Sequence, residues 1–300
     1  MSSSNSANNT SRNQQEAFAE TSIAGKPAGY QIADWQQRFP YISAGITSRH
    51  GGISTGPLAS MNCALHVQDE PQHVIANRAA FADTLGIPVE AWTCAEQVHG
   101  NRVALVTAQQ RGRGRLTRED ALQATDALIT QEPGIWLTAF FADCVPLYFF
   151  DPEHKAVGLA HAGWKGTVLQ IAEETVEAMT SAFGSRPERM LAAVGPSIGA
   201  CCYEVDDAVA KPVREALERM EMAEQEIRFL VPDRERAGKY RLNLQQLNGQ
   251  IMIKAGIMPI HIEICGLCTS CRTDAFYSHR KEHGRTGRMA AWIGIDLTSV

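Results

Sequence analysis

The chain has 300 residues, of which 44% are hydrophobic and 20% charged, and its formal net charge at pH 7 is −5. This composition is typical of a soluble globular protein with one large domain or two fused halves, and we expect one compact unit. The acidic balance gives no support to general binding of nucleic acids or membranes, so small molecules are the expected partners. No apolar run of the sequence approaches the length that spans a bilayer.

Residues 1–28 are rich in Ser, Asn, Gln and Ala, and they lack the apolar segment of a signal peptide. We interpret them as a disordered N-terminal tail and residues 29–300 as a single domain. Without an export signal the protein is expected to be cytoplasmic. Its eight cysteines are then expected to be thiols or metal ligands and not a disulfide framework.

Hydrophobic patterning and turn residues predict the elements of the first half. Strands are expected at residues 45–49, 97–98, 103–106, 126–130 and 135–141, and a helix at 71–85. The polar, arginine-rich segment 109–122 is expected to be an exposed loop.

In the second half, the hydrophobic runs 145–150 and 156–160 flank a turn-rich segment and predict a hairpin. The capping-box pattern from Thr167 to Gln170 predicts the start of a helix that ends near Gly184. Further helices are expected at 206–222 and 244–255, and strands at 190–194, 260–264 and 290–295. Strands and helices mix without a β-α-β rhythm, which favours α+β with mixed sheets over a doubly wound parallel sheet.

The predicted hairpin brings two metal-binding side chains together. Cys144 precedes its first strand and His161 follows the second, so the two residues should be neighbours across the antiparallel ladder. His66 and His99 also have distinctive contexts, and His99 lies at a strand end beside a glycine. One thiolate and two imidazoles with one open position, from His99, Cys144 and His161, match a catalytic zinc site.

Alternatives remain open for each of these residues. A strand histidine can equally be satisfied within the core. Asp143 could orient a ligand, carry protons or only cap a turn. Lys165, the neighbouring glycines and the N-terminus of the helix after His161 could together hold an anion such as phosphate.

A second cysteine-rich segment has the pattern C-x2-C-x2-C, formed by Cys265, Cys268 and Cys271. This pattern could begin an iron–sulfur or zinc site. Because no well-spaced fourth ligand is evident, we interpret the segment as non-metallic. The adjacent Cys201 and Cys202 are expected to be packing residues, since a bond between neighbours would strain the backbone.

Eight strings resemble the bacterial laccase-domain, or multicopper polyphenol oxidase-like, family, whose members are regarded as purine nucleoside phosphorylases and include proteins called peptidoglycan editing factors. The strings are SRHGG (48–52), NCALHVQDEP (62–71), QVHG (97–100), DALIT (126–130), ADCVPLYFFD (142–151), GLAHAGWKGT (158–167), GPSIGACCYEV (195–205) and FYSHRKEHGRTGR (276–288). They cover the chain from about residue 38 to 298. The sequence departs from the commoner family pattern at Asn62-Cys63 and by the additional thiol of Cys265.

The resemblance implies a single layered α/β/β/α unit with mixed sheets, like the catalytic domain of cytotoxic necrotizing factor. It places the family's zinc ligands on His99, Cys144 and His161 here. It also implies phosphorolysis of adenosine, inosine, guanosine and methylthioadenosine to the base and ribose 1-phosphate. Adenosine deamination is implied as a second activity, with Asp143 or Glu204 as a proton carrier.

Phosphate attack requires cations that neutralise a dianion. Arg49 is the preferred candidate for a phosphate clamp, followed by Arg285 and Arg288, because a guanidinium binds phosphate oxygens in bidentate fashion. Each could instead be a surface or packing arginine. The expected partners are therefore purine nucleosides and inorganic phosphate.

Three other functions remain as alternatives to this one. A cysteine hydrolase would use Cys144 as nucleophile and His161 as base, and would not need His99. A cysteine or zinc hydrolase acting on peptidoglycan precursors, as the editing-factor name implies, belongs to the same group. A copper polyphenol oxidase is disfavoured because a trinuclear copper cluster draws on many histidines, typically in His-x-His pairs, and the chain has no such pair. A non-catalytic metal-binding protein is the third alternative.

Overall fold

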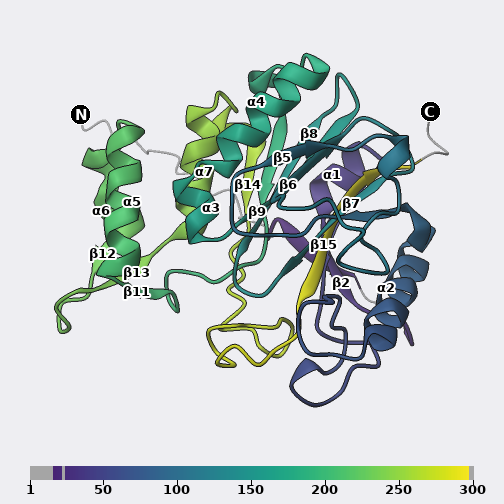
Figure 1. The fold of residues 1–300 in the computed structure, drawn as a ribbon. Coiled ribbons are helices and arrows are strands. Elements are labelled where there is room, and N and C mark those ends of the chain that lie inside the picture. Colours follow the sequence, from purple (N-terminus) through teal and green to yellow (C-terminus); the bar gives the residue numbers. More distant parts are fainter. Residues whose placement is uncertain (1–15, 22–23, 297–300) are drawn as a thin grey trace, which may run out of the picture.

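The computed structural model describes residues 16–21 and 24–296, and its elements form four layers. Two six-stranded sheets pack face to face, and helices cover their outer faces (Figure 1). The strand orders are β1-β2-β3-β15-β7-β4 and β14-β10-β8-β9-β6-β5. Each sheet is mixed, because β4 runs parallel to β7 in the first, and β5 and β14 run parallel to β6 and β10 in the second. The expected α+β layering is confirmed.

The strands of the first sheet are β1 (Phe18–Thr21), β2 (Gly29–Ile32), β3 (Ile42–Thr47), β4 (Trp92–Cys94), β7 (Trp136–Phe141) and β15 (Met289–Ile295). Those of the second are β5 (Val103–Leu105), β6 (Ala127–Thr130), β8 (Val145–Asp151), β9 (Ala156–Ala162), β10 (Leu191–Val194) and β14 (Ile262–Ile264). The helices are α1 (Ala33–Arg38), α2 (Pro71–Leu85), α3 (Trp164–Val168), α4 (Ile171–Phe183), α5 (Asp207–Arg219), α6 (Glu226–Phe229) and α7 (Leu244–Lys254). Single 3₁₀ turns cover Gly56–Leu58, Val89–Ala91, Ala108–Gln110, Pro187–Arg189, Ala223–Gln225 and Pro259–His261.

The sequence of β8 is hydrophobic at successive positions, because the strand is buried on both faces. Tyr148 and Phe150 point into the core between the two sheets, whereas Leu147 and Phe149 pack under the helical layer of α4, α5 and α7. A strand that is buried on both faces has no solvent side on which polar residues could alternate. On the other outer face, α2 packs against the first sheet around Phe81 and Trp292, whose rings lie 5.0 Å apart.

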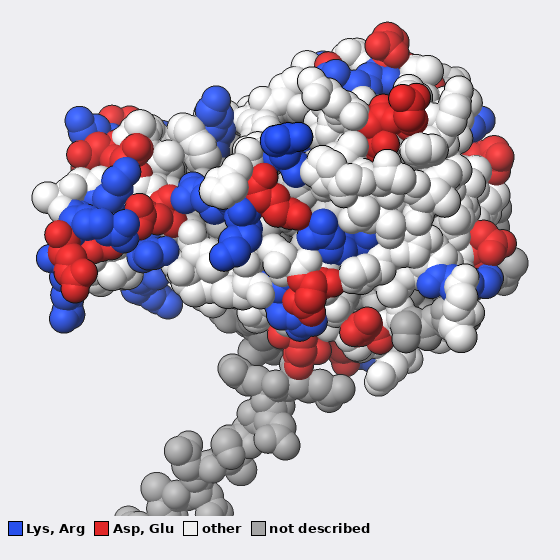
Figure 2. All heavy atoms as spheres, turned by 90° about the horizontal axis from the view of Figure 1, so that it is seen from below, with Lys and Arg blue, Asp and Glu red and all other residues white. Residues whose placement is uncertain are grey.

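A small lobe projects from the sheets at the left of Figure 1. It contains the three-stranded sheet β11 (Glu204–Asp206), β13 (Lys239–Leu242) and β12 (Leu230–Pro232), together with α5 and α6. Side chains of both charges crowd on this lobe (Figure 2). Ion pairs of Arg236 with Glu204 and of Arg214 with Glu226 bring opposite charges together there.

Several expectations from the sequence are confirmed, and three are wrong. The hairpin forms from β8 and β9, and α2 has the predicted bounds. The helix after His161 does not begin with a capping box, because Gln170 is left-handed (φ 60°) and separates the short α3 from α4. Residues 97–98 form a loop and not a strand. Residues 18–21, assigned to the tail, form β1, whereas residues 1–15 and 22–23 lie outside the described part.

Within the described residues, no helix has the length and apolar character needed to cross a membrane.

Candidate metal centre

Three potential ligands meet at one end of the β8–β9 hairpin. Cys144 immediately precedes β8, His161 lies in β9, and His99 comes from the loop after β4. Their ligand atoms all lie within 4.8 Å of one another, and Cys144 Sγ is 3.8 Å from His99 Nε2. The rings of His99 and His161 meet edge to face with centroids 4.7 Å apart. The structure therefore brings together the three residues that the sequence predicted as a set.

The hairpin register and one glycine make this approach feasible. Pro146 pairs with His161 and Val145 with Ala162, so Cys144 lies beside Gly163 at the open end of the ladder. A Cβ atom on Gly163 would be 2.9 Å from His99 Cδ2 and 3.0 Å from Cys144 Sγ. The first contact is shorter than real Cβ atoms show and the second is tighter than most, so a larger residue would push the side chains of His99 and Cys144 aside.

Asp126, which immediately precedes β6, orients His161. Its Oδ1 atom lies 2.9 Å from His161 Nδ1, and both side chains are almost fully buried. This hydrogen bond assigns the proton to Nδ1 and leaves Nε2 available to a metal. Ligating histidines usually donate their second ring nitrogen in this way.

The same carboxylate fixes the loop that carries His99. Asp126 accepts the backbone N–H groups of Val98, His99 and Gly100 at 3.2, 3.0 and 2.7 Å. These bonds support a left-handed backbone at His99 (φ 61°), which is uncommon outside glycine. Sequence reasoning missed Asp126, although it lies in the DALIT string directly before a strand that pairs with the strand of His161.

Cys144, His161 and Asp126 form a charge network. Burial raises the pKa of Cys144, but His161 and His99 outweigh it and lower the value to about 6. Burial lowers the pKa of His161, but the Cys144 thiolate and Asp126 raise it to about 9. Burial raises the pKa of Asp126, whereas its bonds to His161 and to the backbone lower it overall. In the metal-free protein, Cys144 is therefore a thiolate at neutral pH.

Alkylation tests this assignment directly. Metal-stripped protein should be carboxymethylated by iodoacetate at Cys144 at pH 7, because the thiolate is the nucleophile. The rate should fall as the pH drops through about 6, where the thiolate takes up a proton. Peptide mass spectrometry reports on each cysteine, and zinc should protect Cys144. A rate that rises only near pH 9, as for an ordinary thiol, would contradict the charge network.

The donor set and its spacing fit a zinc ion. Zinc bonds of about 2.3 Å to sulfur and about 2.0–2.1 Å to nitrogen imply a tetrahedral S···N separation of about 3.6 Å. The observed separation of 3.8 Å between Cys144 and His99 is close to this value. Three protein ligands leave a fourth position for water or substrate, as in catalytic zinc sites.

The three ligands line a cavity of about 570 Å³. This volume lies within the range of about 300–1,000 Å³ that is typical of small-molecule sites. Its wall combines aromatic and cationic side chains, namely Phe140, Trp164, Tyr203, Arg78, Arg118, Lys165, Arg280 and Arg288. The cavity can therefore offer flat apolar surface and positive charge beside the three potential metal ligands. His66 also lines it.

Asp143 lies in the cavity wall, but both of its oxygens accept hydrogen bonds from the C-terminal segment. Thr269 Oγ1 donates to Oδ1 at 2.7 Å, and the backbone N–H of Arg280 donates to Oδ2 at 2.6 Å. Its own backbone is left-handed, with φ 83°. Asp143 thus connects the chain beside Cys144 to residues more than a hundred positions later. Glu204 lies in β11, outside the cavity lining, and pairs with Arg236 and Arg241.

Of the four cations expected to bind phosphate, Lys165 and Arg288 line the cavity, and Arg49 and Arg285 do not. The Arg49 guanidinium lies 3.1 Å from Glu282 and 2.9 Å from the carbonyl of Thr273, and it stacks on Tyr277. It is therefore engaged in holding loops together. The sequence did not single out Tyr203 and Arg280 as cavity residues, although both lie in the strings that carried the family resemblance.

Comparisons with known proteins agree with this layout. A family model described as "Multi-copper polyphenol oxidoreductase laccase" matches residues 43–296. Purine nucleoside phosphorylase YlmD of Bacillus subtilis is 40% identical over 272 residues, covering 90% of this chain and 95% of that protein. The protein of the same name from Geobacillus stearothermophilus is 42% identical over 252 residues, covering 84% and 89%.

Solved structures show the same fold. The crystal structure of the Bacillus licheniformis hypothetical protein YfiH matches with a TM-score of 0.83 at 43% identity, covering 89% of this chain and 96% of that one. YlmD from Geobacillus stearothermophilus matches with a TM-score of 0.83 at 38% identity, covering 94% and 100%. The family model spans most of the chain, and the relatives align over nearly their whole length. The chain thus belongs to the multi-copper polyphenol oxidoreductase laccase family.

Proposed function

We propose that this protein is a zinc-dependent purine nucleoside phosphorylase, which uses phosphate to split a purine nucleoside into base and ribose 1-phosphate. The observation that carries this proposal is the juxtaposition of a His-Cys-His centre with arginine and lysine side chains in one cavity. The names of the relatives support the choice of reaction. Adenosine, inosine, guanosine and methylthioadenosine are the proposed substrates, with adenosine deamination as a second activity.

Arg288 is the strongest candidate for holding phosphate. Its Nη1 donates to the carbonyls of Thr286 and Gly287, and its remaining guanidinium nitrogens have no acceptor among the described residues. Burial lowers its pKa, although the charges of Cys144 and Asp143 act in the opposite direction. A guanidinium in a cavity of low polarity attracts a dianion more strongly than one in water. Lys165 supplies a second cation on the same wall.

The aromatic side chains of the cavity provide surfaces that can bind the purine base. Trp164 and Tyr203 line the cavity that contains the metal ligands, and each offers a flat surface against which a purine can stack. Asp126 keeps His161 in the tautomer that presents Nε2. Asp143 positions the segment that carries Arg280, since its two oxygens are both engaged. A bound zinc ion would supply Lewis acidity at this point.

Zinc suits the centre better than the copper of the family's name. Among the described residues, only two groups of side chains have metal-ligand spacing, and the group in the cavity contains two histidines. Multicopper oxidation needs several copper ions and many imidazoles. One thiolate and two imidazoles match the mononuclear zinc pattern instead.

One observation favours a second candidate, a cysteine hydrolase. Cys144, His161 and Asp126 form a thiolate, an imidazolium and an orienting carboxylate, which is the arrangement of a cysteine-histidine-aspartate triad. Such an enzyme would cleave its substrate with water and would not need His99 or phosphate. The orienting carboxylate is that of Asp126, whereas Asp143 bonds to Thr269 and Arg280.

Phosphate dependence separates the two candidates. The release of hypoxanthine from inosine should require phosphate and yield ribose 1-phosphate. Chromatography of the reaction mixture measures both products. Arg288→Ala should raise the phosphate KM by at least about tenfold, because one charge-assisted bond to a phosphate contributes about 1.5–3 kcal/mol. Arg285→Ala is the matched control, since Arg285 is exposed and lies outside the cavity lining. Equal hypoxanthine release without phosphate would refute the phosphorylase proposal.

A further inference from the structure

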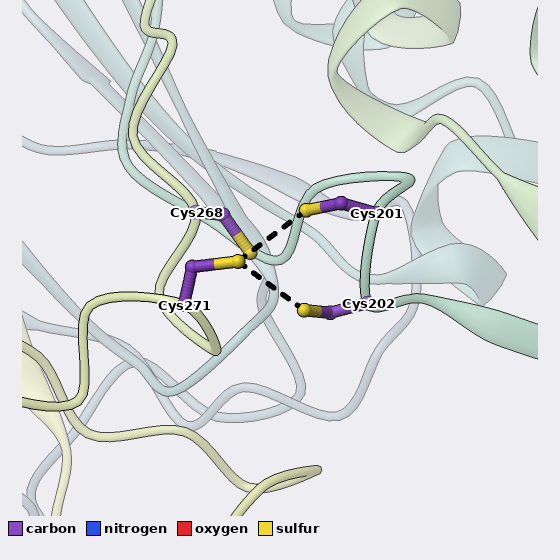
Figure 3. Close-up of side chains that lie close together, drawn as sticks. All are labelled: Cys201, Cys202, Cys268 and Cys271. Carbon is purple, nitrogen blue, oxygen red and sulfur yellow. Dashed lines mark hydrogen bonds between the residues drawn. The ribbon is translucent and has the colours of Figure 1, made fainter.

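A second cluster of potential metal ligands lies outside the cavity lining. It consists of Cys201, Cys202, Cys268 and Cys271 (Figure 3). Their four sulfur atoms all lie within 4.8 Å of one another. Cys271 Sγ is 3.6 Å from Cys201 Sγ and 3.4 Å from Cys202 Sγ. The C-x2-C-x2-C segment was expected to lack a well-spaced fourth ligand. This expectation is wrong, because Cys201 and Cys202 lie beside Cys268 and Cys271.

The sheet brings the two pairs together. Cys201 and Cys202 follow β10, while Cys268 and Cys271 follow β14, and these two strands run side by side in parallel. The pairing continues beyond the strands, where Ser197 bridges Cys268 and accepts the N–H of Thr269 at 3.0 Å. Both segments consequently leave the same edge of the sheet, and their thiols converge there.

Cys265 does not belong to this cluster. It is buried in the core between the sheets, and its Sγ accepts the backbone N–H of Leu267 at 3.4 Å. Cys268 is also buried, but the other three cluster thiols differ, because Cys201 and Cys271 are exposed and Cys202 is half-buried. Thiols whose main role is packing are usually buried, so the expectation that Cys201 and Cys202 are packing residues does not describe them.

We propose that Cys201, Cys202, Cys268 and Cys271 bind a single zinc ion as a closed tetrathiolate site. Four thiolates at about 2.3 Å from zinc in a tetrahedron lie about 3.8 Å from one another. The separations of 3.4 and 3.6 Å from Cys271 to Cys202 and Cys201 are close to this value, and no two of the four sulfur atoms are more than 4.8 Å apart. An iron–sulfur cluster would spread its thiolates over several iron atoms, so the compact arrangement favours one ion.

The surroundings of the thiols fit ligands that carry negative charge. The backbone N–H of Gly199 points at Cys268 Sγ at 3.2 Å, and such bonds stabilise a thiolate. A Cβ atom on Gly199 would lie 3.2 Å from Cys201 Sγ and 3.3 Å from Cys268 Cβ, so glycine leaves room for the sulfur atoms. Arg241 bonds to the carbonyl of Cys201 at 3.1 Å and places a cation beside a site whose net charge would be negative.

This site would have a structural role, because four protein ligands leave no position for a substrate. It joins two segments that build the cavity. One segment continues from Cys202 into Tyr203, which lines the cavity, and the other contains Thr269, which bonds to Asp143 beside Cys144. A zinc ion across them would hold the cavity wall in place without contacting the reaction.

Zinc counting in single variants tests the proposal and also distinguishes the two centres. Wild-type protein purified without added metal should contain two zinc ions per chain by elemental analysis. Cys271→Ser should contain one, His99→Ala should contain one, and the double variant should contain none. Cys265→Ala is the matched control from the same segment and should retain two. The single ion that remains in Cys271→Ser shows that this variant is folded, because it requires an intact cavity.

Cobalt substitution identifies the ligands of the second ion. In the His99→Ala background, Co²⁺ should give the strong thiolate-to-cobalt absorption of a four-sulfur site, and Cys271→Ser should weaken that absorption. Cys271→His restores a ligand of similar preference and should recover zinc binding in part. A zinc content that does not fall in Cys271→Ser would overturn the proposal, whereas a zinc content that does not fall in His99→Ala would bear on the cavity site alone. The proposal would also fail if peptide mapping of the protein isolated with reductant showed a Cys271 disulfide to Cys201 or Cys202.

Discussion

Replacing His99, Cys144 or His161 with alanine is expected to abolish metal binding at the cavity and to reduce nucleoside cleavage by more than about 100-fold. The site has only three protein ligands, and the two that remain after a substitution cannot retain the ion. A Lewis acid typically stabilises the transition state by several kcal/mol. A loss of about 2.7 kcal/mol corresponds to this factor. Zinc content and the rate of hypoxanthine release from inosine, measured on the same samples, test the expectation.

His73→Ala is the matched control, because His73 lies on α2, outside the cavity lining. It should retain full metal content and activity. The pattern among the three ligand variants is as informative as the size of the effect. If His99→Ala kept full activity while Cys144→Ala and His161→Ala were inactive, the metal centre would be excluded and the cysteine hydrolase preferred. Circular dichroism should show an unchanged fold in each variant.

Sequence patterns predicted the elements whose determinants are local. Helix α2 has Pro71 at its first position and Gly86 in the left-handed conformation at its end, and both signals are legible without a structure. The β8–β9 hairpin was legible for the same reason, and it fixed the neighbourhood of Cys144 and His161. The predicted start of a helix at Thr167 is wrong. Thr167 lies inside the short helix α3, and α4 begins only at Ile171, after the left-handed Gln170.

Contacts between distant residues were not predictable in this way. Asp126 lies 35 positions from His161, and its role becomes visible only when β6 pairs with β9. The sequence favours Arg49 as the phosphate ligand, yet its guanidinium pairs with Glu282, 233 positions away, and lies outside the cavity lining. The cysteine cluster likewise depends on the parallel pairing of β10 with β14. In each case the contact depends on how distant parts of the chain are arranged by the sheets, and the local sequence does not encode that arrangement.

Asp126→Asn is expected to weaken zinc binding at the cavity by about 10–100-fold and to reduce catalysis accordingly. The amide keeps the shape of the side chain and one oxygen that can accept the backbone N–H groups of the His99 loop. It removes the negative charge that raises the pKa of His161 and that holds the proton on Nδ1. Substitutions of carboxylates behind ligating histidines cost metal affinity by this factor in other proteins.

Two measurements distinguish this role from simple support of the fold. Competition with a chelator gives the zinc affinity of Asp126→Asn, and Asp83→Asn is the control, because Asp83 is exposed on α2 and pairs with Lys26. Titration of His161 by NMR in metal-free protein should show its pKa lowered from about 9, since a coulombic partner has been removed. Loss of zinc affinity with an unchanged His161 pKa would assign Asp126 to the backbone of the His99 loop alone. An unchanged affinity would mean that the imidazole needs no orienting charge, because the hairpin and Gly163 already determine its position.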